Sequence, residues 1–125
     1  MKKIIKTSNA PSAIGPYSQA VEMKGMLFIS GQVPVDPKTG KLVEGDITVQ
    51  TKQVMKNIEA ILHEAGYSFS DVVKSTCYLA SISDFKAMND VYSVFYTENH
   101  PARAAFAVKD LPLDALIEIE TFAMK

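Results

Sequence analysis

The amino-acid sequence predicts an α+β domain in which two helices pack on one face of a mixed β-sheet. Strand-like apolar runs lie towards both ends of the chain, and two segments between them space their apolar residues as helices do. The composition, 47% hydrophobic and 22% charged, is that of a globular protein. With 125 residues the chain can build one core, so we expect a single domain over residues 1–125.

The first third of the chain has the pattern of short strands. Apolar runs at 4–5, 20–21 and 26–29 are separated by turn residues, and Lys24-Gly25 joins the last two runs in a predicted hairpin. The stretch 34–45 contains two prolines and two glycines, a density of breakers that disfavours both a helix and a strand ladder. We therefore expect a surface loop there.

Two amphipathic helices are predicted in the middle of the chain. Asp46 is a suitable N-cap for the first helix and Gly66 a suitable C-cap, while the second follows Asp84 and stops at His100-Pro101. Apolar residues recur at helical spacing in both segments: Ile47, Val54, Ile58, Ile61, Leu62 and Ala65, then Phe85, Met88, Tyr92, Phe95 and Tyr96. Each helix therefore has one stripe to bury against the sheet.

Three further strands are predicted, at 72–79, 104–108 and 116–124. Alternation in the last strand places Ile117, Ile119 and Ala123 on the face that meets the helices. The opposite face carries Leu116, Glu118, Glu120, Phe122 and Met124. Because no helix is left to cover this mostly apolar face, we expect it to be buried against another subunit in a closed homo-oligomer.

Composition limits the partners and the compartment. A net charge of -1 provides no overall field to attract nucleic acid or anionic lipid, and no apolar run is long enough to span a bilayer. A lone cysteine, Cys77, cannot form an internal disulfide, and the basic start of the chain is not followed by a signal-peptide h-region. We therefore expect a cytoplasmic protein that does not bind nucleic acid or membranes.

No cofactor site is visible in the sequence. Cys-x-x-Cys and His-x-x-x-His spacings are absent, and the glycines fit neither a P-loop nor a dinucleotide fingerprint. His63 and His100 are interpreted as structural, half-buried residues. Cys77 lies in an apolar strand pattern, so we interpret it as core.

Two charged residues in apolar strands are the candidates for chemistry. Arg103 precedes Ala104, Ala105 and Phe106. It is either a surface arginine at a strand end or a clamp for a carboxylate, whose two oxygens match the guanidinium fork. Glu118 lies between two isoleucines and is either an ion-pair partner of Arg103 or a lysine, or a partly desolvated acid/base. Glu120 shares its strand face, so the sequence does not decide between the two.

Three separated motifs resemble those of the RidA/YjgF family of enamine/imine deaminases. They are Ala-Pro-Ser-Ala-Ile-Gly-Pro-Tyr-Ser-Gln at 10–19, Ser-Gly-Gln at 30–32, and Pro-Ala-Arg-Ala-Ala-Phe-Ala-Val-Lys-Asp-Leu at 101–111 followed by Ile-Glu-Ile at 117–119. The resemblance runs along the whole chain. It implies a chorismate-mutase-like fold, a homotrimer with clefts between neighbouring subunits, and hydrolysis of short 2-imino acids or their enamine tautomers to 2-keto acids and ammonia.

The resemblance also implies roles for individual residues. Arg103 would bind the substrate carboxylate and Glu118 would position or activate water. Tyr17, Ser30, Gly31 and Asn89 would line the cleft, with the carbonyl of Arg103 and the amide of Ala105 facing the substrate. From the residues alone, Tyr17 could equally be a loop aromatic, Ser30 and Gly31 a strand end, and Asn89 a solvated helix residue.

Where many family members have a cysteine, this chain has Ala105, which disfavours a thiol-dependent mechanism. Imine hydrolysis needs no thiol, metal or organic cofactor, because water and one proton-relaying carboxyl group suffice. Two other functions are weighed: a regulatory protein that senses 2-keto acids with the same cleft, and an RNA-cleaving protein. The near-neutral charge argues against the second.

Overall fold

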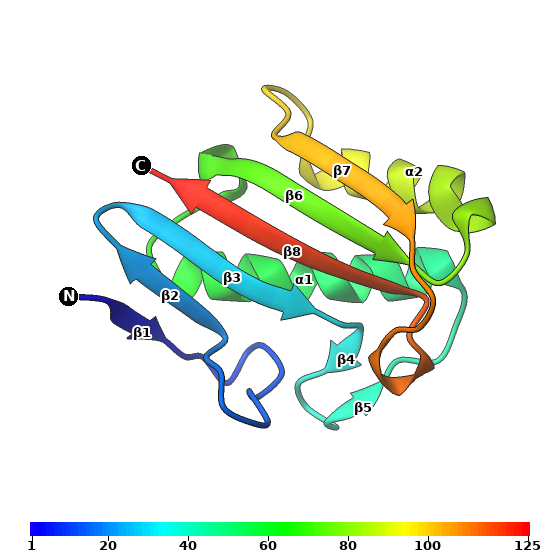
Figure 1. The fold of residues 1–125 in the computed structure, drawn as a ribbon, viewed down its shortest axis with the longest axis horizontal. Coiled ribbons are helices and arrows are strands. Elements are labelled where there is room, and N and C mark those ends of the chain that lie inside the picture. The colour runs from blue at the N-terminus through cyan, green and yellow to red at the C-terminus, as the bar shows by residue number, and fades with distance from the viewer.

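A six-stranded mixed sheet forms the centre of the computed structural model, which describes all of residues 1–125 (Figure 1). In spatial order the strands are β1 (Lys3–Ile5), β2 (Ala20–Met23), β3 (Met26–Gln32), β8 (Ile117–Met124), β6 (Val72–Leu79) and β7 (Ala102–Ala107). Neighbouring strands are antiparallel except β6 and β7, which run parallel. Because β7 is an edge strand, one side of its backbone is unpaired.

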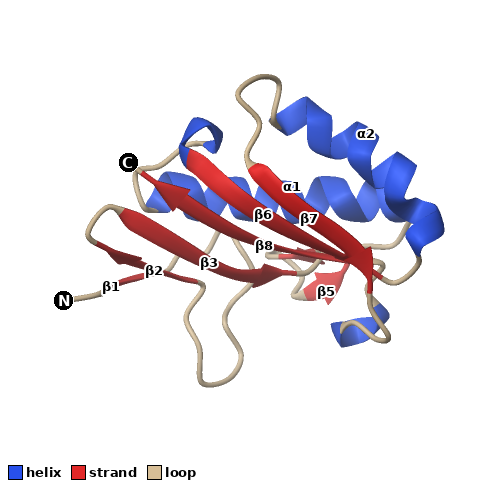
Figure 2. Ribbon diagram, turned by 45° about the horizontal axis from the view of Figure 1, so that its top comes forward, coloured by secondary structure: helices blue, strands red, loops and turns tan.

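Both helices, α1 (Ile47–Glu64) and α2 (Phe85–Phe95), cover the same face of the sheet, as predicted (Figure 2). The predicted start of α1 is confirmed, because the Asp46 carboxylate accepts a hydrogen bond from the amide of Val49 at 3.1 Å. Gly66 follows the C-cap with φ 80°, the left-handed conformation that ends many helices. Short 3-10 turns lie at Phe69–Asp71, Ile82–Asp84 and Pro112–Asp114.

The core lies between the sheet and the helices. Ile117, Ile119 and Ala123 of β8 are buried in it, which confirms the predicted alternation of the last strand. Cys77 is also fully buried, as expected, and burial raises the pKa of its thiol to about 11. This cysteine therefore stays protonated at neutral pH.

Several boundaries differ from the prediction. The stretch 34–45 is not only loop, because β4 (Val35–Asp36) and β5 (Lys41–Leu42) pair as a small hairpin whose turn contains Gly40. Pro37 and Gly40 lie in the turn of this hairpin, and Pro34 and Gly45 lie outside its two strands, so none of the four interrupts the two-residue ladder. The strand β7 begins earlier than expected and includes Arg103, α2 ends at Phe95, and Leu116 packs against the core instead of facing outward.

The sheet face away from the helices is uncovered within the chain, and we call it the open face. Phe28 and Phe122 pack on it with ring centroids 5.4 Å apart, and Tyr78 and Phe106 do so at 5.5 Å. Its burial against another subunit stays a prediction. No helix combines the length and hydropathy needed to cross a membrane.

Candidate functional site

Arg103 projects from β7 towards α2. Its register partner on β6, Ser75, is fully buried on the helix side, so the Arg103 side chain lies on that side as well. One guanidinium nitrogen, Nη1, donates a hydrogen bond to Oδ1 of Asn89 at 2.7 Å. The guanidinium carbon lies 4.8 Å from the ring centre of Tyr92 and 5.4 Å from that of Phe85. We call these four residues the Arg103 cluster.

Neutral groups hold this arginine, so its positive charge is not cancelled. The one ion pair of the structure joins Lys86 and Asp90 and does not involve Arg103. Burial raises the pKa of Tyr92, which keeps its ring a neutral phenol. Each aromatic contact contributes about 0.5–1 kcal/mol at an exposed site and about 2 kcal/mol when desolvated. The guanidinium is thus oriented while its remaining N–H groups stay free to bind an anion.

The unpaired edge of β7 presents backbone groups beside Arg103. The amide of Val108 donates to the carbonyl of Leu79 at 2.9 Å and so points into the sheet. Since backbone groups alternate sides along a strand, the carbonyl of Arg103 and the amide of Ala105 point to the free edge. The methyl group of Ala105 packs against the core. One donor and one acceptor are therefore available at this edge without any contribution from the Ala105 side chain.

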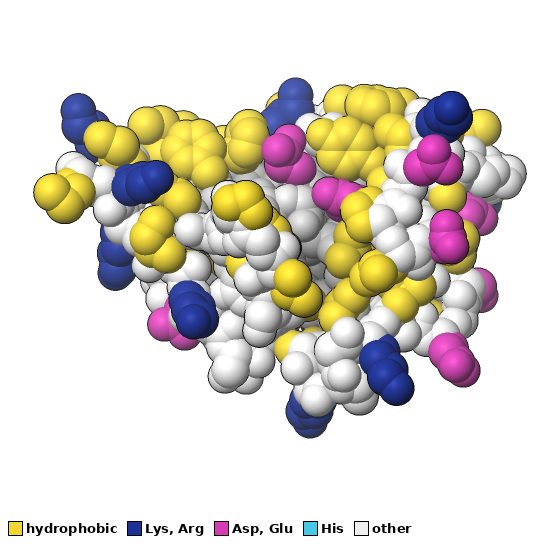
Figure 3. Space-filling view, turned by 60° about the horizontal axis from the view of Figure 1, so that its bottom comes forward, with side chains coloured by type: hydrophobic (Ala, Val, Ile, Leu, Met, Phe, Trp, Pro, Cys, Tyr) yellow, Lys and Arg dark blue, Asp and Glu magenta, His cyan; other side chains and the backbone are white.

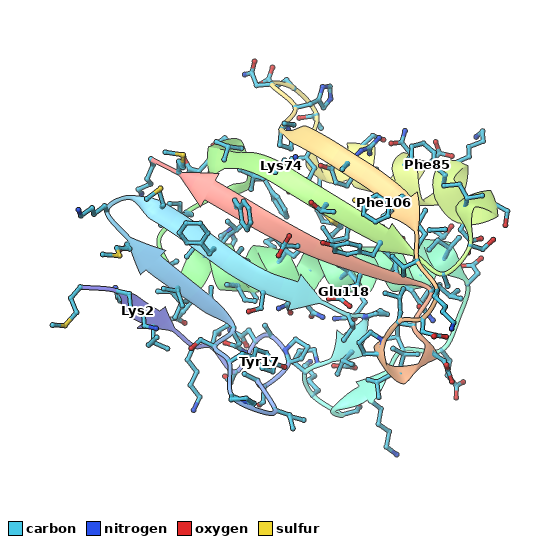
Figure 4. All side chains as sticks on the ribbon, in the orientation of Figure 1. Lys2, Tyr17, Lys74, Phe85, Phe106 and Glu118 are labelled. Carbon is cyan, nitrogen blue, oxygen red and sulfur yellow. The ribbon has the colours of Figure 1, made fainter.

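Glu118 lies on the open face of β8, between Tyr78 of β6 and Gly31 of β3 (Figure 4). A Cβ atom added at Gly31 would clash with Oε2 of Glu118 and lie 2.9 Å from its carboxyl carbon. The carboxyl group therefore occupies the space that the missing side chain of Gly31 leaves open. A hollow of about 280 Å³ adjoins them, lined by Gly31, Tyr78, Val108, Asp110, Leu111, Pro112, Glu118 and Glu120. We call Gly31, Tyr78, Glu118 and Glu120 the Glu118 cluster.

Electrostatics distinguish Glu118 as an acid/base candidate. Burial, and secondly the charge of Glu120, raise the pKa of the Glu118 carboxyl group. Burial and the same two carboxylates raise the pKa of Tyr78. No ion pair neutralises Glu118, so neither of its predicted partners, Arg103 or a lysine, is found beside it. Its raised pKa makes this carboxyl group a better candidate for accepting and donating protons than an exposed glutamate.

Tyr17 and Ser30 lie on the same side of the molecule as Glu118. Tyr17 is 54% exposed on the loop after β1, and its hydroxyl accepts a hydrogen bond from the amide of Ile14 at 3.3 Å. It lines a second hollow that also reaches Gly31. The Ser30 hydroxyl donates to the carbonyl of Ser18 at 2.6 Å, which attaches this loop to β3. The Ser30 side chain therefore fixes the position of the loop that carries Tyr17.

The predicted site residues therefore form two groups within one chain. Tyr17, Ser30, Gly31 and Glu118 gather around the open face, whereas Asn89, Arg103 and Ala105 gather where β7 meets α2. The strand register places Arg103 and Glu118 on opposite faces of the sheet.

Sequence reasoning missed three residues that shape these groups. Phe85 and Tyr92 were assigned to the apolar stripe of a helix, although their spacing with Asn89 places all three on one helix face towards Arg103. Gln19 is buried; its Oε1 accepts from the amide of Thr7 at 2.7 Å and its Nε2 donates to the carbonyl of Pro11 at 2.7 Å. In the sequence, only the position of Gln19 in the 10–19 motif indicated that this residue is special.

The histidines play no part in either group. Both His63 and His100 are exposed, so the expectation that they are half-buried is wrong, while their structural role stays an interpretation. His63 is on the outward side of α1, because its neighbours Ile61 and Leu62 take the buried positions. The structure has no group of three or more His, Cys, Asp or Glu side chains that could hold a metal ion.

Comparison with known proteins gives a consistent result. The model of a family described as endoribonuclease L-PSP matches residues 7–125. A RutC family protein of Pyrococcus horikoshii is 56% identical over 100% of this chain and 99% of its own length. The human protein named 2-iminobutanoate/2-iminopropanoate deaminase is 46% identical over 100% of this chain and 91% of its own.

Solved structures agree with the sequence matches. The crystal structure of RidA from the Antarctic bacterium Psychrobacter sp. is similar with a TM-score of 0.95 and 43% identity, covering 98% of this chain and 99% of that one. Escherichia coli TdcF, solved with bound serine, has a TM-score of 0.94 and 40% identity, covering 98% of each chain.

Proposed function

Because the chain belongs to the RidA/YjgF family, we propose that it hydrolyses reactive imines of 2-keto acids, or their enamine tautomers, to the 2-keto acid and ammonia. The substrates are 2-iminopropanoate, with its tautomer 2-aminoacrylate, and 2-iminobutanoate. These arise when pyridoxal-phosphate enzymes dehydrate serine and threonine. The lone cysteine supports a cytoplasmic location for this activity.

The observation that carries this proposal is the division of the site into two halves. A cation held only by neutral groups is suited to an anionic ligand, and a carboxyl group with a raised pKa is suited to proton transfer. They lie on opposite faces of one sheet, so one small molecule needs the Arg103 cluster of one subunit and the Glu118 cluster of a neighbour. The uncovered apolar surface of the open face supports such an assembly, which we propose is a homotrimer.

In the proposed reaction, Arg103 binds the substrate carboxylate through its free guanidinium edge, and Asn89 keeps that edge in place. Water attacks the imine carbon while the Glu118 carboxylate takes one proton from the water and passes it to the imine nitrogen, which gives a neutral carbinolamine. Glu118 then takes the proton of the carbinolamine hydroxyl and passes it to the nitrogen, so that the C=O bond forms, the C–N bond breaks and ammonia leaves. The free carbonyl of Arg103 and amide of Ala105 can hold imine and water together in this cleft.

The remaining residues would close the cleft from the neighbouring subunit. Gly31 leaves room for the Glu118 carboxyl group, Ser30 fastens the loop that carries Tyr17, and the Tyr17 ring would cover the substrate. The relative TdcF was solved with serine, a small molecule that has the same carboxylate beside a nitrogen-bearing carbon. This likeness supports a ligand of that class here.

The proposal is tested by coupling the protein to a threonine or serine dehydratase and following 2-keto acid release while semicarbazide traps the free imine. The wild type should accelerate release. Arg103→Ala should lower kcat/KM by about 10²-fold, since a bidentate charged contact is lost, and Glu118→Gln by about 10²-fold or more. An unchanged release rate with wild-type protein would rule out deamination of these substrates.

The same variants separate the enzyme from a regulatory protein that binds 2-keto acids. A sensor needs Arg103 for affinity but has no use for a proton-relaying carboxyl group. Calorimetric titration with 2-oxobutanoate should show that Arg103→Ala abolishes binding while Glu118→Gln retains it. If the wild type bound 2-oxobutanoate through Arg103 but did not accelerate imine hydrolysis, the sensor would be the better account.

A further inference from the structure

Buried hydroxyl groups lie in the core behind the Arg103 cluster. Figure 3 shows one face of the molecule, on which charged side chains project from the surface into solvent. Five hydroxyl oxygens, by contrast, are buried and have no hydrogen-bond partner within the protein: those of Thr51, Ser75, Tyr92, Tyr96 and Thr121. A buried polar group loses its hydrogen bonds to solvent on folding, so such a number of unpaired hydroxyls needs an explanation.

Four of these hydroxyls come together in one place. Ser75 on β6 and Thr121 on β8 are register partners, and both are fully buried on the helix side of the sheet. Tyr92 on α2 and Tyr96 at the end of this helix have ring centres 4.6 Å apart. Burial raises the pKa of both tyrosines, and the neighbouring Ser75 hydroxyl opposes that rise, so both phenol groups lie beside Ser75. We call these four residues the hydroxyl cluster.

The fifth hydroxyl, that of Thr51 on α1, lies apart from the cluster. The side chain of the preceding Gln50 accepts a hydrogen bond from the amide of Leu116 at 2.8 Å. Leu116 precedes Thr121 by five residues of extended chain, which corresponds to about 16 Å. Thr51 is therefore near the other end of β8 and provides a matched control for the cluster.

The chemistry of the hydroxyl cluster fits a water molecule. Each hydroxyl offers one donor hydrogen and two acceptor lone pairs. Although the four groups are neighbours, no two of them form a hydrogen bond with each other. Internal waters in proteins typically make about three hydrogen bonds to buried polar groups that have no other partner, and buried tyrosine hydroxyls usually have a partner. A single water among these hydroxyls would satisfy most of the set.

We propose that one water molecule is bound within the hydroxyl cluster, and that this water positions the Tyr92 ring on which the Arg103 guanidinium rests. The ring centre of Tyr92 lies 4.8 Å from the guanidinium carbon, while its hydroxyl is buried in the cluster. Tyr92 is thus a positioning residue, which acts on the substrate carboxylate only through Arg103. The water site is independent of the proposed function, whereas its effect on substrate binding rests on that function.

A high-resolution crystal structure of the whole protein tests the water site directly. Electron density for a water molecule should lie within about 2.6–3.2 Å of at least three of the four hydroxyl oxygens of the cluster. Two results would overturn the proposal: no density at this position, or hydroxyl groups that form hydrogen bonds only with one another.

Removing one hydroxyl at a time gives an independent test, because a bound water and an unpaired hydroxyl predict opposite signs. Tyr96→Phe and Thr121→Val keep the shape of the side chain. If each takes a partner from a bound water, the melting temperature at fixed protein concentration should fall by about 3 °C or more. If the hydroxyls are unpaired, it should rise. Thr51→Val removes a buried hydroxyl outside the cluster and should not lower it. Unchanged or higher melting temperatures in the first two variants would contradict the water site, and so would an equal fall in Thr51→Val.

Tyr92→Phe tests the link to Arg103, because it keeps the ring and removes only the hydroxyl. The KM for the imine should rise about threefold to fivefold with little change in kcat, since the ring beneath the guanidinium is no longer fixed. Thr51→Val should match the wild type. An unchanged KM in Tyr92→Phe would refute the positioning role.

The same experiments separate this inference from the proposed function. If the wild type hydrolyses no imine, the proposed function fails, while the electron density and the melting temperatures still decide whether the water site exists. The positioning role is then judged by calorimetry with 2-oxobutanoate. Weaker binding by Tyr92→Phe supports it, and equal binding, or no binding by the wild type, refutes it.

Discussion

Arg103 and Glu118 are both charged residues in apolar strands, yet the molecule surrounds them differently. Arg103 is on an edge strand, where an amide and two aromatic rings hold it and no acid cancels its charge. Glu118 is on a central strand, half-buried beside a second carboxylate, and this environment raises its pKa. The first environment preserves a permanent charge and the second favours a change of protonation. Under the proposed function, binding and proton transfer would thus be carried by two separate parts of the chain.

The largest effect is expected when a subunit that lacks Arg103 is combined with a subunit that lacks Glu118, because each can supply the residue that the other has lost. Arg103→Ala and Glu118→Gln should each be nearly inactive as homo-oligomers. Co-expressed with different tags and purified as mixed trimers, they should regain about a third of wild-type activity, because each mixed trimer has one cleft of the three in which an intact Arg103 faces an intact Glu118. Steady-state imine hydrolysis measures the recovery.

As a control, the two variants are mixed under conditions that prevent subunit exchange, and this mixture should recover no imine hydrolysis. If mixed oligomers also remain inactive, Arg103 and Glu118 do not act from different subunits, and the site lies within one chain or elsewhere.

Gly31→Ala should disturb the Glu118 cluster and leave the Arg103 cluster intact. The new methyl group would occupy the position of the Glu118 carboxyl group and displace it, while the backbone at Gly31 is not in the left-handed region. We expect kcat to fall by about 10²-fold, the loss typical of misplacing a reacting group by about 1 Å, with little change in the affinity for 2-oxobutanoate. In a Glu118→Gln background the same substitution should cost almost nothing more; additive losses would mean that Gly31 acts independently of Glu118.

The fold was largely predictable and the division of the site was not. Alternation in 117–124 and helical spacing in 47–65 depend on contacts between neighbouring residues, which a sequence pattern records directly. The face on which Arg103 lies depends on the register of β7 against β6, set by tertiary packing, and β7 was expected to begin after Arg103. For the same reason the aromatic contacts of Arg103 were not foreseen, although Phe85 and Tyr92 were recognised as one face of a helix.

Substitutions of Asn89, in the Arg103 cluster, should have an effect of intermediate size on substrate binding. Asn89→Ala removes the hydrogen bond that orients the guanidinium, so KM should rise about fivefold to tenfold while kcat changes little. Asn89→Asp keeps the contact but partly neutralises the cation, so it should raise KM further. The neighbouring Asp90→Ala breaks only an exposed ion pair and should match the wild type. If Asn89→Asp bound substrate better than Asn89→Ala, the orientation of the Arg103 guanidinium would matter more for substrate binding than its full positive charge.

The smallest expected effect is that of Glu118→Gln on the free energy of unfolding. It tests whether the surroundings of Glu118 disfavour its charged form. The folded protein raises the pKa of this group above its unfolded value, so wild-type stability is fully present below the unfolded pKa and decreases as pH rises through the folded one. Glu118→Gln cannot ionise and should therefore be more stable than the wild type at neutral pH, by less than about 1 kcal/mol because solvent screens a half-buried group. Urea unfolding at a series of pH values should show this advantage vanish on acidification. An advantage that is constant with pH would mean that glutamine gains stability through packing and not through the loss of an unfavourable charge.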